Sequence, residues 1–337
     1  MTPDVAPTVE ETATDIAEME VRGAATIADA AAAALADQAE ASTADTPAAF
    51  RADLEAAATE LYRTRPTAVS LPNALRYVLR GLEPEDDREG EPVKSVDRLR
   101  TETVARARRF QRDLEHAQDT LGRVGANRLR DGDVVMTHCH STDALSCIEA
   151  AVEDGKHIEA IVKETRPRLQ GHITARALRE MGVPVTLIVD NAARRYLDET
   201  DHVLVGADSI AADGSVINKI GTSGLAVNAR ERGVPVMVAA QSIKLHPDTM
   251  TGHTVEIEMR DEREVLEADN YLQIASDETS GAKGDSDDGL TVENPAFDVT
   301  PPRHVDAIVT EHGQYPPESV VVLMRELFGE TTTDPWR

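Results

Sequence analysis

Two apolar segments in the second half of the chain decide its fold class. Val134–Ser141 (VVMTHCHS) reaches the thiol of Cys139 and then turns polar, and Val203–Ile210 (VLVGADSI) reaches the carboxylate of Asp208. Ligands of open α/β sheets bind outside the carboxyl ends of parallel strands. We therefore expect this thiol and this carboxyl to face one pocket, an arrangement suited to proton transfer.

Short apolar runs alternate with helix-like segments from Asp133 onward. We expect strands at residues 134–136, 158–162, 185–189, 202–205, 236–239 and 307–309, with helices at 145–154, 171–181, 192–199 and 224–232. This alternation predicts βαβ units and a Rossmann-like parallel sheet in a catalytic domain at 127–337. Residues 276–291 are rich in Gly, Ser and Asp, which predicts a flexible insertion.

The first part of the chain, residues 1–126, is predicted to be a separate helical domain. Its Ala-rich stretches at 24–36 and 50–61 have high helix propensity, and a long helix is expected from about Ser95 to Val124. The expected fold class is therefore α/β, with a helical N-terminal domain followed by a Rossmann-like, parallel-sheet C-terminal domain.

The charge balance is strongly acidic, with 61 Asp and Glu against 35 Lys and Arg and a formal net charge of -26. An acidic surface with few lysines is typical of a protein kept soluble in high salt, so we expect a halophilic host. Nucleic acid is excluded as a main partner because phosphate backbones need basic patches. An anionic substrate would need locally concentrated Arg and Lys.

Cell location follows from what the sequence lacks. No stretch approaches the roughly 20 apolar residues that span a bilayer, and the first residues have no signal-peptide pattern. Two cysteines cannot form a disulfide framework. We therefore expect a soluble cytoplasmic protein with no membrane partner.

Cys139 is the candidate base. A lone cysteine often merely packs in a core, which is how we interpret Cys147. Cys139 differs because it closes a strand just before a helix, and helix N-termini lower the pKa of a thiol. In an extended segment His138 and His140 would lie on the face opposite Cys139, which argues against a Cys/His metal cluster.

Several segments have the character of phosphate-binding sites. Asp208 alone could cap a turn, but Asn218–Gly224 (NKIGTSG) adds an amide, the ammonium of Lys219, glycines and hydroxyls that open a helix. Further bases occur in Arg22-Gly23-Ala24-Ala25, in 63–67 with Arg65, in 164–171 with Arg166, and at Lys244. Each base alone is more often a surface residue. Together they suit a substrate with more than one phosphate.

These residues carry a family resemblance that covers nearly the whole chain. The sequence resembles the superfamily of translation initiation factor 2B alpha, beta and delta subunits and related sugar-phosphate isomerases. The most specific motifs are Gly206-Ala207-Asp208 with 218–222 (NKIGT), and Asn294–Pro302 (NPAFDVTPP). Within the superfamily, the chain is most similar to the archaeal ribose-1,5-bisphosphate isomerases, which convert ribose 1,5-bisphosphate to ribulose 1,5-bisphosphate.

The resemblance implies a homo-oligomer built from dimers, with no metal and no organic cofactor. It implies that Cys139 and Asp208 are the catalytic pair. It also implies a set of residues that bind the bisphosphorylated pentose: Arg22, Gly23, Ala24, Arg65, Arg166, Asn218, Lys219 and Lys244. The implied pathway is nucleoside breakdown that feeds central carbon metabolism.

The chemistry suits these groups, because the isomerisation takes a proton from C2 and delivers one at C1. Cys139 with a lowered pKa would be the base, and Asp208 the acid or a shuttle between substrate oxygens. A protonated Asp208 requires burial. Lys219 would stabilise the enediolate, and the arginines would fix the phosphates.

Two alternatives remain open from the sequence. Methylthioribose-1-phosphate isomerases use the same thiol and carboxyl, but they typically have Asn and a Gly-bearing turn where this chain has His140-Ser141, and a proline that 22–25 (RGAA) lacks. A noncatalytic regulatory subunit of the initiation factor 2B type would not need the reactive pair. The two departures from the methylthioribose-1-phosphate isomerase pattern, and the presence of both Cys139 and Asp208, favour the bisphosphate enzyme.

The net charge predicts salt dependence of stability. Molar salt should raise the melting temperature, because it shortens the Debye length to about 3 Å and screens the repulsion among acidic side chains. Thermal melts across a potassium chloride series measure this effect. A melting temperature that does not change with salt would contradict the halophilic interpretation.

Overall fold

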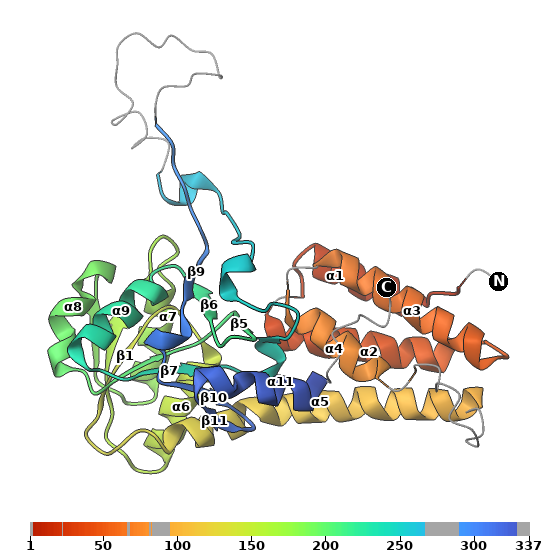
Figure 1. The fold of residues 1–337 in the computed structure, drawn as a ribbon, viewed down its shortest axis with the longest axis horizontal. Coiled ribbons are helices and arrows are strands. Elements are labelled where there is room, and N and C mark those ends of the chain that lie inside the picture. The colour runs from red at the N-terminus through yellow and green to blue at the C-terminus, as the bar shows by residue number, and fades with distance from the viewer. Residues whose placement is uncertain are drawn as a thin grey trace, which may run out of the picture.

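The computed structural model describes residues 3–21, 23–65, 68–80, 82, 95–266 and 290–328. Helices α1 to α4 lie at one end of the molecule and the strands at the other, and the long helix α5 runs along both (Figure 1). The expected α/β class, with helices preceding a Rossmann-like sheet, is confirmed. Within the described residues, no helix combines the length and apolar character that crossing a membrane requires.

The helical part consists of α1 (Pro7–Ala17), α2 (Ala24–Ala41), α3 (Pro47–Thr64), α4 (Ser70–Leu79) and α5 (Val96–Ala126). Local sequence explains where α3 begins, because the Thr46 side chain accepts a hydrogen bond from the Ala49 N–H and Pro47 occupies the first turn. The alanines of α2 allow it to pack closely against α4 and α5. Phe50 and Leu54 of α3 are fully buried in the resulting core.

Helix α5 connects two hydrophobic cores. Leu99 and Ala107 in its first half belong to the helical core, whereas Leu121 and Ala126 at its end belong to a core that includes α6 (Thr142–Glu153). A Cβ built on Gly125 would lie 2.2 Å from the Cys147 Sγ, so only glycine allows this approach of α5 to α6. Cys147 is fully buried, which confirms its interpretation as a core residue.

The larger sheet has the strand order β11-β10-β7-β4-β1-β2-β3. Its strands are β1 (Val134–Thr137), β2 (Glu159–Lys163), β3 (Val185–Ile188), β4 (His202–Val205), β7 (Val236–Ala239), β10 (Ala307–Thr310) and the antiparallel edge β11 (Gly313–Tyr315). All six strands expected from the sequence are present and parallel. The chain runs outward from β1 through β2 to β3, and then returns to β4 on the other side of β1. The edge between β1 and β4 is therefore the topological switch point, where ligands of such sheets bind.

The remaining helices cover this sheet and include α7 (Gln170–Glu180), α8 (Ala193–Tyr196), α9 (Thr222–Arg232) and α11 (Val320–Phe328). Short 3₁₀ turns include η1 (Asp190–Ala192) and η3 (Ser242–Lys244). The expected helices at 145–154, 171–181 and 224–232 correspond to α6, α7 and α9. The stretch expected as a helix at 192–199 holds only one turn of α-helix between 3₁₀ turns.

A second, four-stranded sheet was not predicted from the sequence. Its order is β8-β5-β6-β9, with β5 (Ser209–Ala211), β6 (Val216–Lys219), β8 (Leu245–His246) and β9 (Phe297–Thr300). Strands of two to four residues are too short to show an alternating pattern. This sheet fixes the positions of Asp208, Lys219 and Lys244 relative to one another. Of the expected insertion at 276–291, residues 276–289 lie outside the described residues.

Candidate active site

Cys139 follows β1 in a left-handed backbone conformation, with φ of 68°. Its N–H donates to the Thr165 Oγ1 at 2.9 Å, and its C=O accepts from the Thr174 Oγ1 at 2.8 Å. The Cys139 Sγ lies 3.4 Å from the Gln170 Oε1 at the start of α7. A non-glycine residue in this conformation costs about 1–3 kcal/mol and persists only where its surroundings hold it. Here two hydroxyls and an amide hold the thiol in one position.

His138 and Thr165 help to hold the backbone at Cys139 in place. The His138 Nε2 donates to the Ile220 C=O at 2.8 Å, which leaves Nδ1 to accept from the Thr165 hydroxyl at 3.2 Å. Burial, reinforced by the charge of Lys163, lowers the pKa of His138 to about 4, so its ring is neutral. The end of β1 is thereby joined to the end of β2 and to the turn before α9.

Asp208 follows β4 and stands across the switch point from Cys139. Its N–H donates to the Ile217 C=O of β6 at 2.9 Å. The side chain is accessible to water, yet surrounding protein atoms raise the pKa of its carboxyl, against the opposing effects of Lys244, Lys219 and Arg260. The direction of this pKa shift is the one that a protonated Asp208 requires.

Two lysines bring positive charge to this carboxyl. Lys219, at the end of β6, is buried, and its Nζ donates to the Ala296 C=O at 3.1 Å and lies 4.7 Å from the centre of the Phe297 ring. Burial lowers the pKa of Lys219. Lys244 is presented by η3 and pairs with the buried Asp143 carboxylate at 2.8 Å.

The pKa of the Cys139 thiol is raised, and the expectation of a lowered pKa was wrong for the protein without ligand. Burial is the largest cause, and the negative charge of Asp208 adds to it, while the His140 N–H, Lys219 and Arg260 act in the opposite direction. Helix α6 does not reverse this, because its cap is Ser141, two residues further along the chain. Cys139, Asp208, Lys219 and Arg260 thus share one electrostatic environment.

The other expected site residues are distributed over several elements. Gly23 caps α2 and Ala24 is its first residue, and α2 packs against η3, whereas Arg22 lies outside the described residues. Arg65 is the half-buried cap of α3. The Asn218 side chain is buried and donates to the Thr222 Oγ1 at 3.0 Å.

Arg166 lies elsewhere, beside a cavity between the end of β2, η1 and the first turns of α9. Of the expected residues, the structure therefore brings together Cys139, Asp208, Lys219 and Lys244.

Arg260 was missed in the sequence. It reaches the site through pairing of its segment with a family motif, since the Arg260 N–H donates to the Asn294 C=O at 2.9 Å and the Ala296 N–H donates to the Glu258 C=O at 2.8 Å. Its guanidinium carbon lies 5.9 Å from the Phe297 ring centre, close to Lys219. No local pattern around Arg260 points to this role. The specificity of the Asn294–Pro302 motif was the one available signal.

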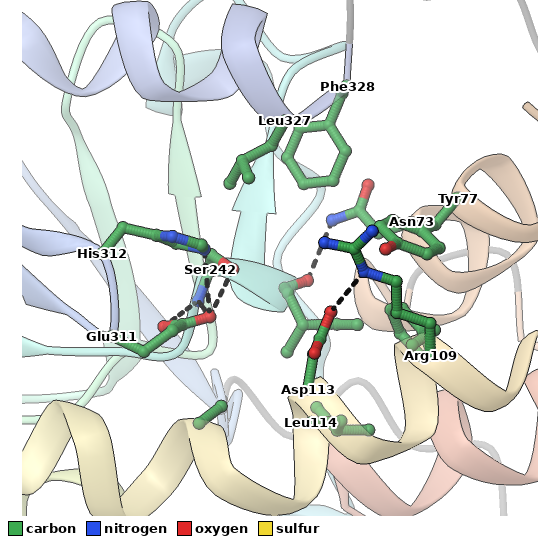
Figure 2. A pocket seen from close by; sticks show the side chains of 13 residues that line it. Asn73, Tyr77, Arg109, Asp113, Leu114, Ser242, Glu311, His312, Leu327 and Phe328 are labelled. Atoms are coloured by element: carbon green, nitrogen blue, oxygen red, sulfur yellow. Dashed lines mark hydrogen bonds and ion pairs between the residues drawn. The ribbon is translucent and has the colours of Figure 1, made fainter. Parts of the chain in front are cut away.

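A separate cavity of about 260 Å³ lies behind η3, where the helical part meets the sheet. Figure 2 shows the Asn73 and Tyr77 side chains on one side of it, and Ser242 with Glu311 on the other. None of the expected site residues lines this cavity. Its walls nevertheless hold η3, because the Asn73 Nδ2 donates to the Ile243 C=O at 2.9 Å and the Glu311 carboxylate accepts from Ser242.

In the described part of the chain, no three His, Cys, Asp or Glu side chains are grouped so that they could hold a metal ion. The groups that could act chemically are a thiol, a carboxyl and cations. The fold and the site together define a Rossmann-like protein in which a thiol and a carboxyl lie in a cationic setting.

Comparison with known proteins agrees with this class. The sequence profile of the Initiation factor 2 subunit family matches residues 20–317, and the chain belongs to that family. A ribose 1,5-bisphosphate isomerase from Haloterrigena turkmenica is 75% identical over 334 residues, which cover 99% of this chain and 98% of that protein. A protein of the same name from Haloferax volcanii is 65% identical, covering 98% and 96%. Both organisms are halophilic archaea, in agreement with the expectation from the net charge.

Among solved structures, 5-methylthioribose 1-phosphate isomerase from Pyrococcus horikoshii OT3 is 33% identical. It superimposes with a TM-score of 0.67 and covers 96% of this chain and 88% of its own.

Thiol alkylation tests the electrostatics of the site. The reaction of Cys139 with iodoacetamide should show a pH midpoint above that of an ordinary thiol. Lys219→Met should move the midpoint up because a cation is lost, and Asp208→Asn should move it down because an anion is lost. Burial raises the pKa of Cys147 to about 12, so this thiol is an unreactive internal reference. Mass spectrometry measures the alkylation of each cysteine across pH and gives the midpoint for Cys139 in wild type and in each variant. Midpoint shifts of the same sign in the two variants would contradict the arrangement.

Proposed function

We propose that this protein is an aldose–ketose isomerase that converts ribose 1,5-bisphosphate to ribulose 1,5-bisphosphate. The observation that carries the proposal is the shared environment of Cys139 and Asp208 at the switch point, in a chain 75% identical to a protein with that activity in its name. The reaction needs a base, an acid and cations for phosphate, and all three kinds of group are present there.

The first step opens the sugar ring. Asp208, protonated, gives its proton to the ring oxygen as the bond from that oxygen to C1 breaks, while the Cys139 thiolate takes the proton from C2. The electron pair of the C2–H bond forms a C1=C2 double bond, which yields an enediol phosphate. Lys219 and Arg260 stabilise the negative charge that develops on the ring oxygen as its bond to C1 breaks.

The second step forms the ketone. The Cys139 thiol returns its proton to C1, and the Asp208 carboxylate takes the proton of the C2 hydroxyl. Both groups end in their starting protonation states, so the cycle needs no cofactor.

The raised pKa values of the two groups are compatible with this cycle because the groups are coupled. The negative charge of Asp208 opposes ionisation of Cys139, so a protonated Asp208 removes one obstacle to the thiolate. The reactive state therefore has one proton on the pair, held by the carboxyl.

The substrate is proposed to lie between η3, β6 and the start of α2. Lys219 and Lys244 are two of the cations available to phosphate, and Gly23 at the α2 N-terminus provides a backbone that a phosphate could approach. Arg22 and Arg65 are proposed as further phosphate ligands on the strength of the resemblance.

Assembly into a homo-oligomer built from dimers, in the cytoplasm, is part of the same proposal. Exposed apolar side chains on one edge of the molecule support it: Leu187 of β3 is 47% exposed, and Ile173 of α7 is 51% exposed. β3 is the edge strand of the larger sheet. A second copy could cover this edge.

Substitution of the pair tests the chemistry. Cys139→Ser and Asp208→Asn should each lower kcat by about 10²–10⁴, the usual contribution of a general acid or base. Cys147→Ala is the matched control, because it removes the other thiol from a core position, and it should stay within a few fold of wild type. Turnover measured from formation of ribulose 1,5-bisphosphate decides the outcome. A Cys139→Ser enzyme as active as the control would remove this thiol from the mechanism.

Substrate preference separates the two isomerase alternatives. Methylthioribose 1-phosphate has an apolar thioether where the bisphosphate has its second phosphate. A site built to bind that phosphate should favour the bisphosphate by about 10⁴ in kcat/KM, since its polar groups would otherwise lack partners. The two sugars are compared at the same salt concentration. Equal or better use of methylthioribose 1-phosphate would overturn the bisphosphate assignment, and no turnover of either sugar by purified protein would favour a regulatory subunit.

A further inference from the structure

A cavity of about 330 Å³ is lined in part by Ile220 and Gly221, which follow β6. It is enclosed by the end of β2, by η1 and α8, and by the first two turns of α9. Its polar lining consists of Lys163, Arg166, Asp190, Asn191, Arg194 and Asn228. Cys139, Asp208, Lys219 and Lys244 do not line it, so it is distinct from the site described above.

The charge of this lining is opposite to that of the protein. Three bases face one carboxylate, in a chain whose formal net charge is -26. The carboxylate of Asp190 is already committed, because its two oxygens accept the N–H groups of Thr165 at 2.9 Å and Arg166 at 2.8 Å. It shapes the loop after β2 and leaves the cavity lined mainly by hydrogen-bond donors.

Lys163 is the buried cation of this cavity, with only 4% of its surface exposed. Among the described residues, its Nζ makes one hydrogen bond, to the Gly221 C=O at 3.3 Å. An ammonium has three donors, and a charge removed from water without enough partners is unfavourable. Burial lowers the pKa of Lys163, against the opposing charges of Asp190 and Asp298. An anion in the cavity would supply the missing acceptors.

Two arginines complete the donor set at the rim. Arg166 and Arg194 are exposed, and the Arg194 Nη1 lies 3.3 Å from the Asn228 Oδ1. Guanidinium groups bind phosphate oxygens through two parallel hydrogen bonds. In high salt a chloride ion would compete for such a site, but it has a single charge and no fixed set of acceptors. Several converging donors therefore favour a tetrahedral dianion.

We propose that this cavity is a second anion site, which binds a phosphate group either as inorganic phosphate or as a phosphate monoester. This assigns Arg166 to the cavity in place of the substrate contact expected from the sequence. The proposal does not depend on which reaction Cys139 performs. It places an anion next to Gly221, one residue from Ile220, whose C=O holds His138.

Calorimetric titration of inorganic phosphate into the full-length protein, in phosphate-free potassium chloride, tests the site. Arg166→Gln/Arg194→Gln should weaken or remove one binding event by about tenfold or more, as expected when charge-assisted hydrogen bonds are lost. Arg303→Gln/Arg325→Gln is the matched control, since it removes the same charge from exposed positions outside this cavity. Equal phosphate binding by wild type and both double variants would overturn the proposal. Arg166→Gln alone serves if the double variant does not fold.

A second titration separates this cavity from the catalytic site. With ribulose 1,5-bisphosphate saturating, one phosphate per chain should still bind to wild type and not to Arg166→Gln/Arg194→Gln. Complete displacement of phosphate by the bisphosphate would show that no separate site exists. If the bisphosphate itself does not bind, the proposed isomerase function fails, while the first titration still decides the cavity.

The source of the phosphate is identified by repeating the second titration with ribose 5-phosphate. Tighter arginine-dependent binding of the sugar phosphate assigns a monoester, and tighter binding of the inorganic ion assigns free phosphate. If the arginine substitutions change the binding of neither ligand, the proposal is overturned.

Discussion

Parallel pairing of β1 with β4 is the constraint on which the site depends. Val135 pairs with His202 and Met136 with Val203, so the two strands end at the same level of the sheet. The residues that follow them, Cys139 and Asp208, therefore come after the ends of adjacent strands, where the charge of Asp208 acts on the Cys139 thiol. Neither residue could take part in a shared proton transfer if these strands were not neighbours.

The smaller sheet then brings positive charge to these two residues. Antiparallel pairing of β6 with β9 sets Lys219 opposite Phe297, and the segment that follows Asn294 brings Arg260 to the same ring. A strongly acidic protein thus concentrates cations where an anionic intermediate would form. Because these cations are partly or wholly buried, the salt that screens the surface weakens them less.

The contact between the helical part and the sheet also supports this site. Helix α5 crosses from the helical core to the α6 core, and Asn73 of α4 holds η3 through the carbonyls of Ile243 and Leu245. η3 carries Lys244 to Asp143. Movement of the helical part relative to the sheet would therefore displace Lys244 and change the charge around Asp208.

The turn between β6 and α9 contacts two sets of residues. It follows Lys219, and its residues Ile220 and Gly221 line the cavity that also includes Lys163, Arg166 and Arg194. The Ile220 and Gly221 carbonyls are held by His138 and Lys163 respectively. One short turn is thus in contact with both His138, the residue before Cys139, and the proposed anion site.

The sequence by itself determined the α/β class and the six parallel strands, because strand and helix periodicities are local. It also pointed to Cys139, Asp208, Lys219 and Lys244 as candidate residues, since strand ends mark the ligand edge of such a sheet, and the resemblance implied their roles. Tertiary structure alone decided the smaller sheet, the approach of Arg260, and the separation of Arg166 from Lys219. It also decided the pKa of Cys139, which a local pattern placed too low. These properties depend on burial and on contacts between residues far apart in the chain, and neither leaves a periodic signal in the sequence.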